Sequence, residues 1–247
     1  MGDAHAAKNT SLKVTGASVP FNDEPLTLVA GSGGKVWQIS SLAKDVWDPT
    51  TTFTVAEDVD SDGIIDAGEE IASSSYEIDY LFGVVRFDTD RTGQTILASG
   101  AYHPHYFVPM GRAVSWNSSY NTLDASVFFD TGPRMKLGQR SLDATVEHID
   151  TEALPLDGQA GTEDTLGDIL GNGRRLVLEY GPQGTADGTP TGARQGKVRR
   201  AWARLTNDSK SLSLGELVGS ELSFQLASVN AAQAGQSASS IDVFNYS

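Results

Sequence analysis

Hydrophobic and polar residues alternate with a period of two over much of the chain. This alternation is typical of antiparallel β-strands that bury one face and expose the other. Turns rich in glycine and proline, such as residues 130–133, separate the alternating segments. The sequence therefore predicts an all-β fold, either a β-sandwich or a rolled β-barrel. The alternating segments are residues 53–55, 76–80, 85–87, 135–137, 142–146, 212–214 and 222–226.

One segment, residues 162–171, has a helical pattern instead. Thr162 is a suitable N-cap, apolar residues recur at a spacing of three and four, and Gly171 can end the helix. We therefore expect one short α-helix that flanks the β-domain. Residues 174–180, which follow, contain a continuous apolar run and predict a buried strand.

The length of 247 residues fits a single β-domain over residues 1–247 with polar ends. Residues 2–11 and 229–240 are polar and low in complexity, and residues 181–196 form a long segment rich in Gly, Thr and Pro. Segments of this composition bury too little apolar surface to offset the entropy of ordering them. The sequence therefore predicts an N-terminal arm at 1–20, a flexible C-terminal tail at 228–247 and long loops.

Composition excludes several classes of function. With 18 basic and 32 acidic residues the net charge is −14, which repels the phosphate backbone and disfavours tight binding to nucleic acid. The absence of cysteine excludes thiol nucleophiles, iron–sulfur clusters and cysteine zinc sites. The chain shows no signal-peptide pattern and no apolar stretch long enough to span a bilayer, so we expect no membrane partner.

Charge is also segregated along the chain. Residues 141–173 contain eight acidic residues and no Lys or Arg, whereas residues 174–210 contain eight basic residues, Arg199, Arg200 and Arg204 among them. One interpretation is a solvated acidic face with pairing inside the chain. The other is a set of complementary patches between neighbouring copies in an oligomer. The sequence leaves both open.

The strongest local motif is residues 58–69, DVDSDGIIDAGE. It matches the twelve-residue EF-hand calcium loop, with Asp at positions 1, 3, 5 and 9, Gly at 6 and Glu at 12. Ca²⁺ takes six to eight oxygen ligands, and a tight turn at the glycine directs the flanking carboxylates to one point. The predicted ligands of a structural Ca²⁺ are the side chains of Asp58, Asp60, Asp62, Asp66 and Glu69 and the carbonyl of Ile64.

The context of this loop differs from an EF-hand. The residues on either side of it predict strands rather than helices, so we expect a hairpin inserted at residues 56–72. The alternative is an acidic hairpin that matches the pattern by chance. A second acidic segment, residues 88–93, lacks the closing glutamate and carries Arg91, which predicts only a turn.

Catalytic patterns are absent from the sequence. His103 and His105 are interpreted as a surface pair at a strand end, and residues 31–35 lack the spacing of a phosphate-binding loop. No nucleophile elbow or dinucleotide-binding fingerprint occurs. We therefore expect that the protein is not an enzyme.

Several segments together resemble the major tail tube proteins of tailed bacteriophages. The likeness covers most of the chain and depends on the order and spacing of strand patterns. The segments that carry it are residues 8–16 (KNTSLKVTG), 37–39 with 46–49 (WQI and VWDP), 76–87 (YEIDYLFGVVRF), 201–205 (AWARL), 211–214 (SLSL) and 221–225 (ELSFQ).

This resemblance implies a β-sandwich or rolled barrel that assembles into hexameric rings, stacked into a hollow tube for DNA ejection. The partners it implies are further copies of the chain, the tape measure, terminator and tail tip proteins, and DNA that passes without tight binding through an acidic lumen. The implied location is the virion, after assembly in the cytoplasm of the bacterial host. The calcium-like loop is not part of the family pattern.

A second function remains open from the sequence. Calcium-binding β-sandwich domains of surface or adhesion proteins often carry Asp-x-Asp-x-Asp-Gly loops. Such a domain is expected to stay monomeric, whereas a tube subunit is expected to associate with itself.

Overall fold

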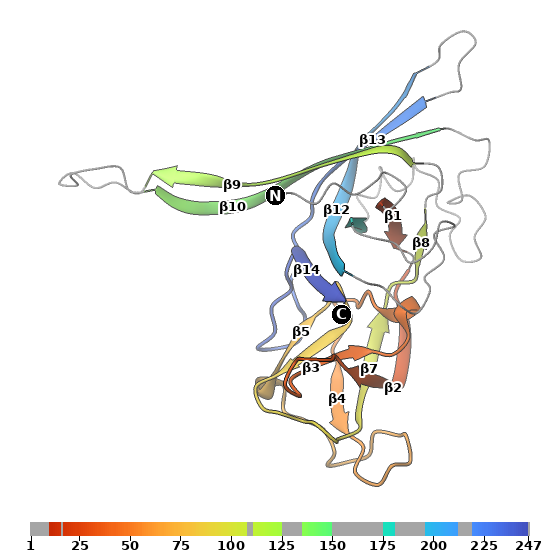
Figure 1. Ribbon diagram of the computed structural model, residues 1–247, viewed down its shortest axis with the longest axis vertical. Helices are drawn as coiled ribbons and strands as arrows, with labels where there is room; N and C mark the ends of the chain where they lie inside the picture. The colour runs from red at the N-terminus through yellow and green to blue at the C-terminus, as the bar shows by residue number, and fades with distance from the viewer. Residues whose placement is uncertain are drawn as a thin grey trace, which may run out of the picture.

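Antiparallel strands build the fold, which is all-β as the alternation predicts (Figure 1). The structure is a computed structural model that describes residues 10–15, 17–107, 111–124, 135–149, 175–180, 196–211 and 219–246. The helix predicted at 162–171 lies outside the described residues. Two short 3₁₀ turns, η2 (Leu42–Lys44) and η3 (Ser73–Ser75), lie within them.

The first sheet has eight strands and contains the longest ones. In spatial order it runs β8 (His105–Phe107), β1 (Thr10–Thr15), β11 (Arg175–Tyr180), β12 (Gly196–Ser211), β13 (Gly219–Leu226), β10 (Met135–Ile149) and β9 (Gly111–Asp124). The eighth strand, β14 (Ile241–Tyr246), pairs with the first part of β12, and β13 pairs with the second part of the same edge. The buried strand predicted at 174–180 is confirmed as β11, where Val177 and Leu178 are buried.

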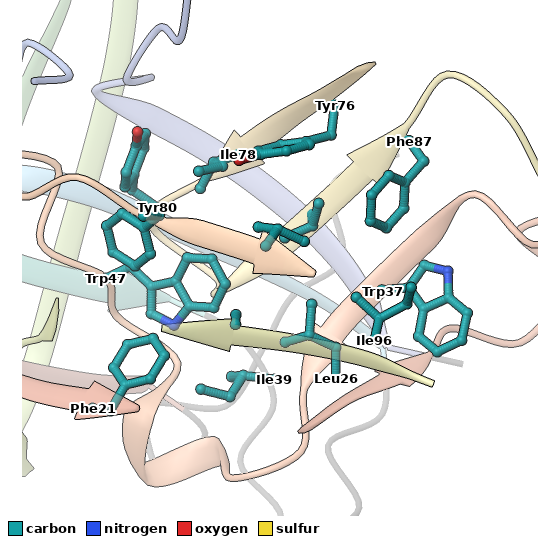
Figure 2. Close-up of a cluster of buried hydrophobic side chains, with 14 residues drawn as sticks. Phe21, Leu26, Trp37, Ile39, Trp47, Tyr76, Ile78, Tyr80, Phe87 and Ile96 are labelled. Atoms are coloured by element: carbon teal, nitrogen blue, oxygen red, sulfur yellow. The ribbon is translucent and has the colours of Figure 1, made fainter. Parts of the chain in front are cut away.

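The second sheet has six strands and holds the main aromatic core. Its order is β4 (Thr54–Glu57), β7 (Ile96–Tyr102), β2 (Val19–Leu28), β3 (Val36–Ile39), β6 (Val84–Phe87) and β5 (Tyr76–Asp79). Figure 2 shows Phe21, Trp47 and Tyr80 gathered at one end of this cluster and Trp37 at the other. The rings of Trp47 and Phe53 stack with their centroids 4.8 Å apart, so this end of the core is closely packed.

A second apolar cluster joins the two sheets. It combines Leu81 and Phe82, from the turn between β5 and β6, with Trp202 of β12 and Phe244 of β14. The rings of Phe82 and Phe244 stack at 5.5 Å. Because this cluster takes residues from both sheets, neither sheet buries its apolar surface alone.

Arg200 on β12 lies inside this contact with no exposed surface. Its guanidinium donates to Glu179 Oε2 at 2.6 Å, to Asp45 Oδ2 at 2.8 Å and to the Leu81 carbonyl at 2.6 Å. The group also lies 4.7 Å from the centre of the Phe82 ring. This basic residue is therefore paired inside the chain, whereas its neighbour Arg199 is exposed.

The predicted C-terminal tail, residues 228–247, packs against both sheets in its described part, and its flexibility stays a prediction. Gln233 accepts from the Phe53 amide at 3.0 Å and donates to the Tyr76 hydroxyl at 3.1 Å. Gln236 accepts from the Ile78 amide at 2.9 Å. The two glutamines replace backbone partners for the second sheet, and β14 joins the first. The amide side chains therefore add polar contacts to the apolar ones that Phe244 of the same segment makes in the second cluster.

The described part of the predicted N-terminal arm, residues 1–20, includes a paired strand. β1 pairs with β11 at Thr10–Leu12 and with β8 at Lys13–Thr15, and β2 begins at Val19. This part of the segment belongs to both sheets, because its backbone groups find partners in neighbouring strands.

Candidate metal centre

The acidic loop at residues 58–69 begins where β4 ends, and its two ends lie side by side. The Glu57 amide donates to the Glu69 carbonyl at 3.1 Å, and Ala56 and Glu70 form an antiparallel bridge. The Asp58 amide donates to the Thr95 carbonyl, just before β7, at 3.0 Å. In Figure 1 the loop lies beyond β4, at the end of the second sheet away from the first. The sheet therefore fixes the base of the loop.

Side-chain carboxylates direct the first half of the loop into a tight turn. Asp58 Oδ2 accepts from the Gly63 amide at 3.2 Å, Asp60 Oδ1 from the Asp62 amide at 3.3 Å, and Asp62 Oδ1 from the Ile64 amide at 2.8 Å. Gly63 has a φ of 79°, in the left-handed region that glycine adopts without strain. These bonds fix the orientation of the three carboxylates relative to the turn.

Glu69 closes the second half of the loop. Its Oε1 accepts from the Val59 amide at 2.8 Å and its Oε2 from the Asp66 amide at 3.0 Å. One glutamate therefore spans from the beginning of the loop to its end, and both of its oxygens point towards the loop backbone.

The turn brings the predicted side-chain ligands together in two groups that share Asp60. Carboxylate oxygens of Asp58, Asp60 and Glu69 lie within 4.8 Å of one another, and so do those of Asp60, Asp62 and Asp66. Two oxygens bound to one Ca²⁺ at 2.3–2.6 Å are at most about 5 Å apart, so each group by itself fits within one coordination sphere. The side chain of Ile64 is 52% exposed, and its carbonyl stays a predicted ligand.

Asp58 differs from the other carboxylates because it is buried, with 7% exposure. Its Oδ1 atom is buried and accepts no hydrogen bond from any residue the structure describes. Leaving an ionised oxygen buried without a partner is costly. A hydrogen-bond donor or a cation at this oxygen would therefore stabilise the folded loop.

Negative charge accumulates in the loop without a balancing base. The Asp62 amide acts to lower the pKa of Asp60, but partial desolvation and the charges of Asp62, Glu69 and Asp66 outweigh it and raise that pKa. Residues 58–69 contain no Lys or Arg. Arg91, close to the base of the loop, lies 3.6 Å from Glu57, outside the motif.

Asp23 is a residue of this site that sequence reasoning missed. It lies in β2 at an irregularity in the pairing with β7, and its φ is 52°. Its Oδ1 accepts from the Ile65 amide of the loop at 3.2 Å and from the Ser99 hydroxyl at 3.3 Å. The only signal in the sequence is an Asn-Asp pair inside a strand pattern, which indicates a bulge but not its contact with a distant loop.

The other candidate sites from the sequence are the second acidic segment and His103, and both make ordinary structural contacts. In the second acidic segment, Asp90 Oδ1 accepts from the Thr92 amide at 2.8 Å and from the Thr92 hydroxyl at 2.7 Å, as in an ordinary turn. His103, expected at the surface, is partly buried instead. Its Nε2 lies 3.6 Å from Asp48 Oδ1, and its ring packs edge to face with that of Trp202 at a centroid distance of 5.8 Å.

Comparison with known proteins gives only distant matches. No family model matches the chain, and no curated protein matches it. Among solved structures, a chain of the virion of a native gene transfer agent particle matches with a TM-score of 0.36 and 15% identity, over 51% of this chain and 85% of that one. A chain from the tail of an empty gene transfer agent particle, refined with C6 symmetry, matches with the same TM-score and identity, over 51% and 84%. A similarity at this level carries no argument about function.

Among the described residues, no helix has the length and apolar character needed to cross a membrane.

Proposed function

We propose that this chain is a structural subunit of a virus-like tail, whose copies form hexameric rings that stack into a hollow tube. The observation that supports this most directly is the outer part of the β9–β10 hairpin. In Figure 1 this pair of strands extends well beyond the rest of the molecule. A third strand of the same chain pairs with only part of this hairpin.

The pairing register defines the unsupported part. β13 pairs with β10 from Asp143 to Ile149, whereas β9 continues to pair with β10 as far as the Met135–Asp124 pair. Within the described parts of the chain, residues 118–124 and 135–142 therefore form a two-stranded ribbon with no third strand. Seven residues of strand extend for roughly 23 Å. A ribbon of two strands is at best marginally stable in water unless another surface covers it.

The occupant we propose for this ribbon is a second copy of the chain. β9 is the last strand of its sheet, so one edge of it offers backbone N–H and C=O groups to another strand. Repeated contact of this type between identical subunits closes into a ring when the rotation between neighbours is a simple fraction of a turn. The sixfold ring is what the resemblance to tail tube proteins implies.

The charge of the chain is compatible with a tube that carries DNA. The net charge is −14 on each copy, and in this proposal part of the acidic excess lines the interior, where it repels phosphate and lets DNA pass without binding. In this proposal the protein resides in the virion after assembly in the host cytoplasm. Its partners are further copies and the tape measure, terminator and tail tip proteins, and it has no enzymatic role.

Light scattering and negative-stain electron microscopy of the full chain over a range of concentrations test the proposal. We expect mass that grows with concentration, with rings or hollow filaments of uniform width. Replacing residues 120–140 with Asn-Gly joins the opposed residues Ser119 and Ser141 through a two-residue turn and removes most of the ribbon. This variant is expected to keep its β-sheet circular dichroism and to stay monomeric. A full chain that is monomeric at every concentration, or a ribbon-deleted variant that still forms rings, overturns the proposal.

The second candidate function is that of a calcium-binding domain of a surface or adhesion protein. The loop at residues 58–69 favours it, because its carboxylates converge as described above. The same measurements separate the two candidates, since a surface domain remains monomeric in calcium.

A further inference from the structure

The acidic loop has a feature that an ordinary acidic turn lacks. Asp58 is more than nine-tenths buried, and its Oδ1 accepts no hydrogen bond from the described residues. Its other oxygen accepts from the Gly63 amide, so the side chain is held in place rather than free to turn towards solvent. A buried carboxylate oxygen in this state is stabilised by a cation more than by water alone.

The neighbours of Asp58 fit a hard divalent cation. Oxygens of Asp60 and Glu69 lie within 4.8 Å of it and of each other, and no basic side chain in the loop competes for them. Ca²⁺ accepts six to eight oxygens in a flexible geometry, including bidentate carboxylates. Mg²⁺ demands a smaller octahedral sphere and gives up its waters reluctantly. An all-oxygen set with several carboxylates therefore favours Ca²⁺.

We propose that residues 58–69 bind one Ca²⁺ through the carboxylates of Asp58, Asp60 and Glu69, and that Asp23 is the residue that positions this loop on the second sheet. The inference is independent of the proposed tail function, because every residue it uses lies within one chain.

Asp23 connects the middle of the loop to the second sheet through the Ile65 amide. The loop base is already held by the Asp58 amide at the Thr95 carbonyl. Asp23 Oδ1 adds a second attachment through the Ile65 amide, and the Ser99 hydroxyl of β7 orients the same oxygen. The Asp23 amide in turn donates to Ser99 Oγ at 2.9 Å. Binding of Ca²⁺ at the loop is therefore coupled to the stability of β2, β4 and β7.

Isothermal titration calorimetry and thermal unfolding of the full chain, stripped of metal with EDTA, test the site. We expect saturable binding of one Ca²⁺ per chain, with Mg²⁺ binding at least roughly tenfold more weakly. At a calcium concentration 100-fold above the dissociation constant, the melting midpoint is expected to rise by roughly 5–10 °C.

Two exposed aspartates provide a matched pair of variants. Asp60 and Asp90 both accept hydrogen bonds from the backbone within a turn, but only Asp60 belongs to the carboxylate groups. Asp60→Asn is expected to weaken Ca²⁺ binding by about tenfold or more, because affinity follows the charge of the ligand set. Asp90→Asn is expected to leave it unchanged. No saturable binding up to about 10 mM calcium, or equal effects of the two substitutions, overturns the site.

A second pair of variants, Asp23→Asn and Asp23→Ala, tests the role of Asp23. Asp23→Asn keeps the carbonyl oxygen that accepts from Ile65 and is expected to retain most of the affinity. Asp23→Ala removes the acceptor and is expected to weaken binding by about 10–100-fold, as is usual when the support of a metal ligand is lost. If Asn and Ala have the same effect, or if neither changes the dissociation constant, Asp23 does not position the loop.

Discussion

Arg200 Nη2 and Asp45 Oδ2 lie 2.8 Å apart, and neither side chain has any exposed surface. Arg200 comes from β12 of the first sheet and Asp45 from the segment between β3 and β4 of the second. The same guanidinium reaches Glu179 and the Leu81 carbonyl. One arginine therefore pairs with two buried carboxylates and a backbone carbonyl where the sheets meet, and the planar fork of its donors suits this task better than a lysine.

Arg200→Met is expected to destabilise the protein by about 3–5 kcal/mol, because it removes the buried positive charge that pairs with the carboxylates of Asp45 and Glu179. Arg199→Met, one residue earlier on the same strand and exposed, is expected to change stability by less than about 0.5 kcal/mol. Urea unfolding followed by tryptophan fluorescence measures both. Similar losses for the two variants contradict the assigned role of Arg200.

The buried carboxyl of Asp79 predicts how the free energy of unfolding changes as the pH approaches neutrality. Burial is the main cause that raises the pKa of this carboxyl to about 7, and the nearby Asp242 adds to it, against the opposing effect of Arg86. Between pH 4 and 7 the folded protein therefore holds a proton that the unfolded chain releases. The free energy of unfolding falls as the pH rises through this range.

Asp79→Asn is expected to remove this slope, and the variant should be more stable than the wild type at pH 8 and similar at pH 4. Each kcal/mol corresponds to roughly 2–4 °C in melting midpoint for a chain of this size. Asp88→Asn, at an exposed position beyond β6, is the control and should keep the slope. Melting curves between pH 4 and 8 measure how the stability depends on pH. An unchanged pH dependence in Asp79→Asn contradicts the role assigned to Asp79.

Asp48 gives a prediction of the opposite sign. Burial acts to raise its pKa, but hydrogen bonds with His103, Thr50 and Ser18 outweigh burial and hold that pKa well below its ordinary value of 3.8. Its contribution to stability is therefore present above about pH 4 and is lost as the pH falls towards the folded-state value.

His103→Leu is expected to raise the pH at which the protein unfolds in acid and to cost about 1–3 kcal/mol at neutral pH. His103→Gln, which keeps a donor, is expected to have a smaller effect. Acid titration monitored by circular dichroism measures the midpoint. Equal midpoints for wild type and His103→Leu would argue against this contact.

A comparison of alanine substitutions at two glycines distinguishes the cost of backbone strain from the cost of steric crowding. Gly83 and Gly93 have positive φ values of 58° and 86°. A Cβ at Gly83 lies 2.9 Å from Ile39 Cγ2 and 3.0 Å from Trp47 Nε1, whereas one at Gly93 meets nothing within 4 Å. Gly93→Ala is expected to cost about 1–2 kcal/mol from the left-handed conformation alone. Gly83→Ala is expected to cost about 1–3 kcal/mol more from overpacking. Urea unfolding of both variants measures the difference.

Local patterns predict local structure well in this chain. The alternation at residues 76–80, 85–87 and 222–226 depends only on which face of a strand is buried, and the structure has β5, β6 and β13 there. The Asp and Gly spacing at residues 58–69 likewise predicts a turn whose carboxylates face one another, because the pattern and the turn are set by neighbours in sequence. Whether a cation binds there stays a prediction.

Contacts between distant residues could not be predicted in the same way. Nothing near Arg200 in the sequence indicates Asp45, which precedes it by 155 residues. Gln233 and Gln236 lie in a segment whose composition favours disorder, yet each replaces a backbone partner at the second sheet. Composition averages over a segment and does not detect two amides at the right positions.

The position of β14 has a consequence for how the protein folds during synthesis. β14 covers residues Gly196–Ala201 of β12 and brings Phe244 onto Phe82, but it emerges from the ribosome after every other described strand. Until then, the contact between the sheets lacks one of its aromatic rings, and that part of β12 has an open edge. A nascent chain therefore completes the contact between its sheets only after β14 has been translated, so closure of that contact is a late folding step.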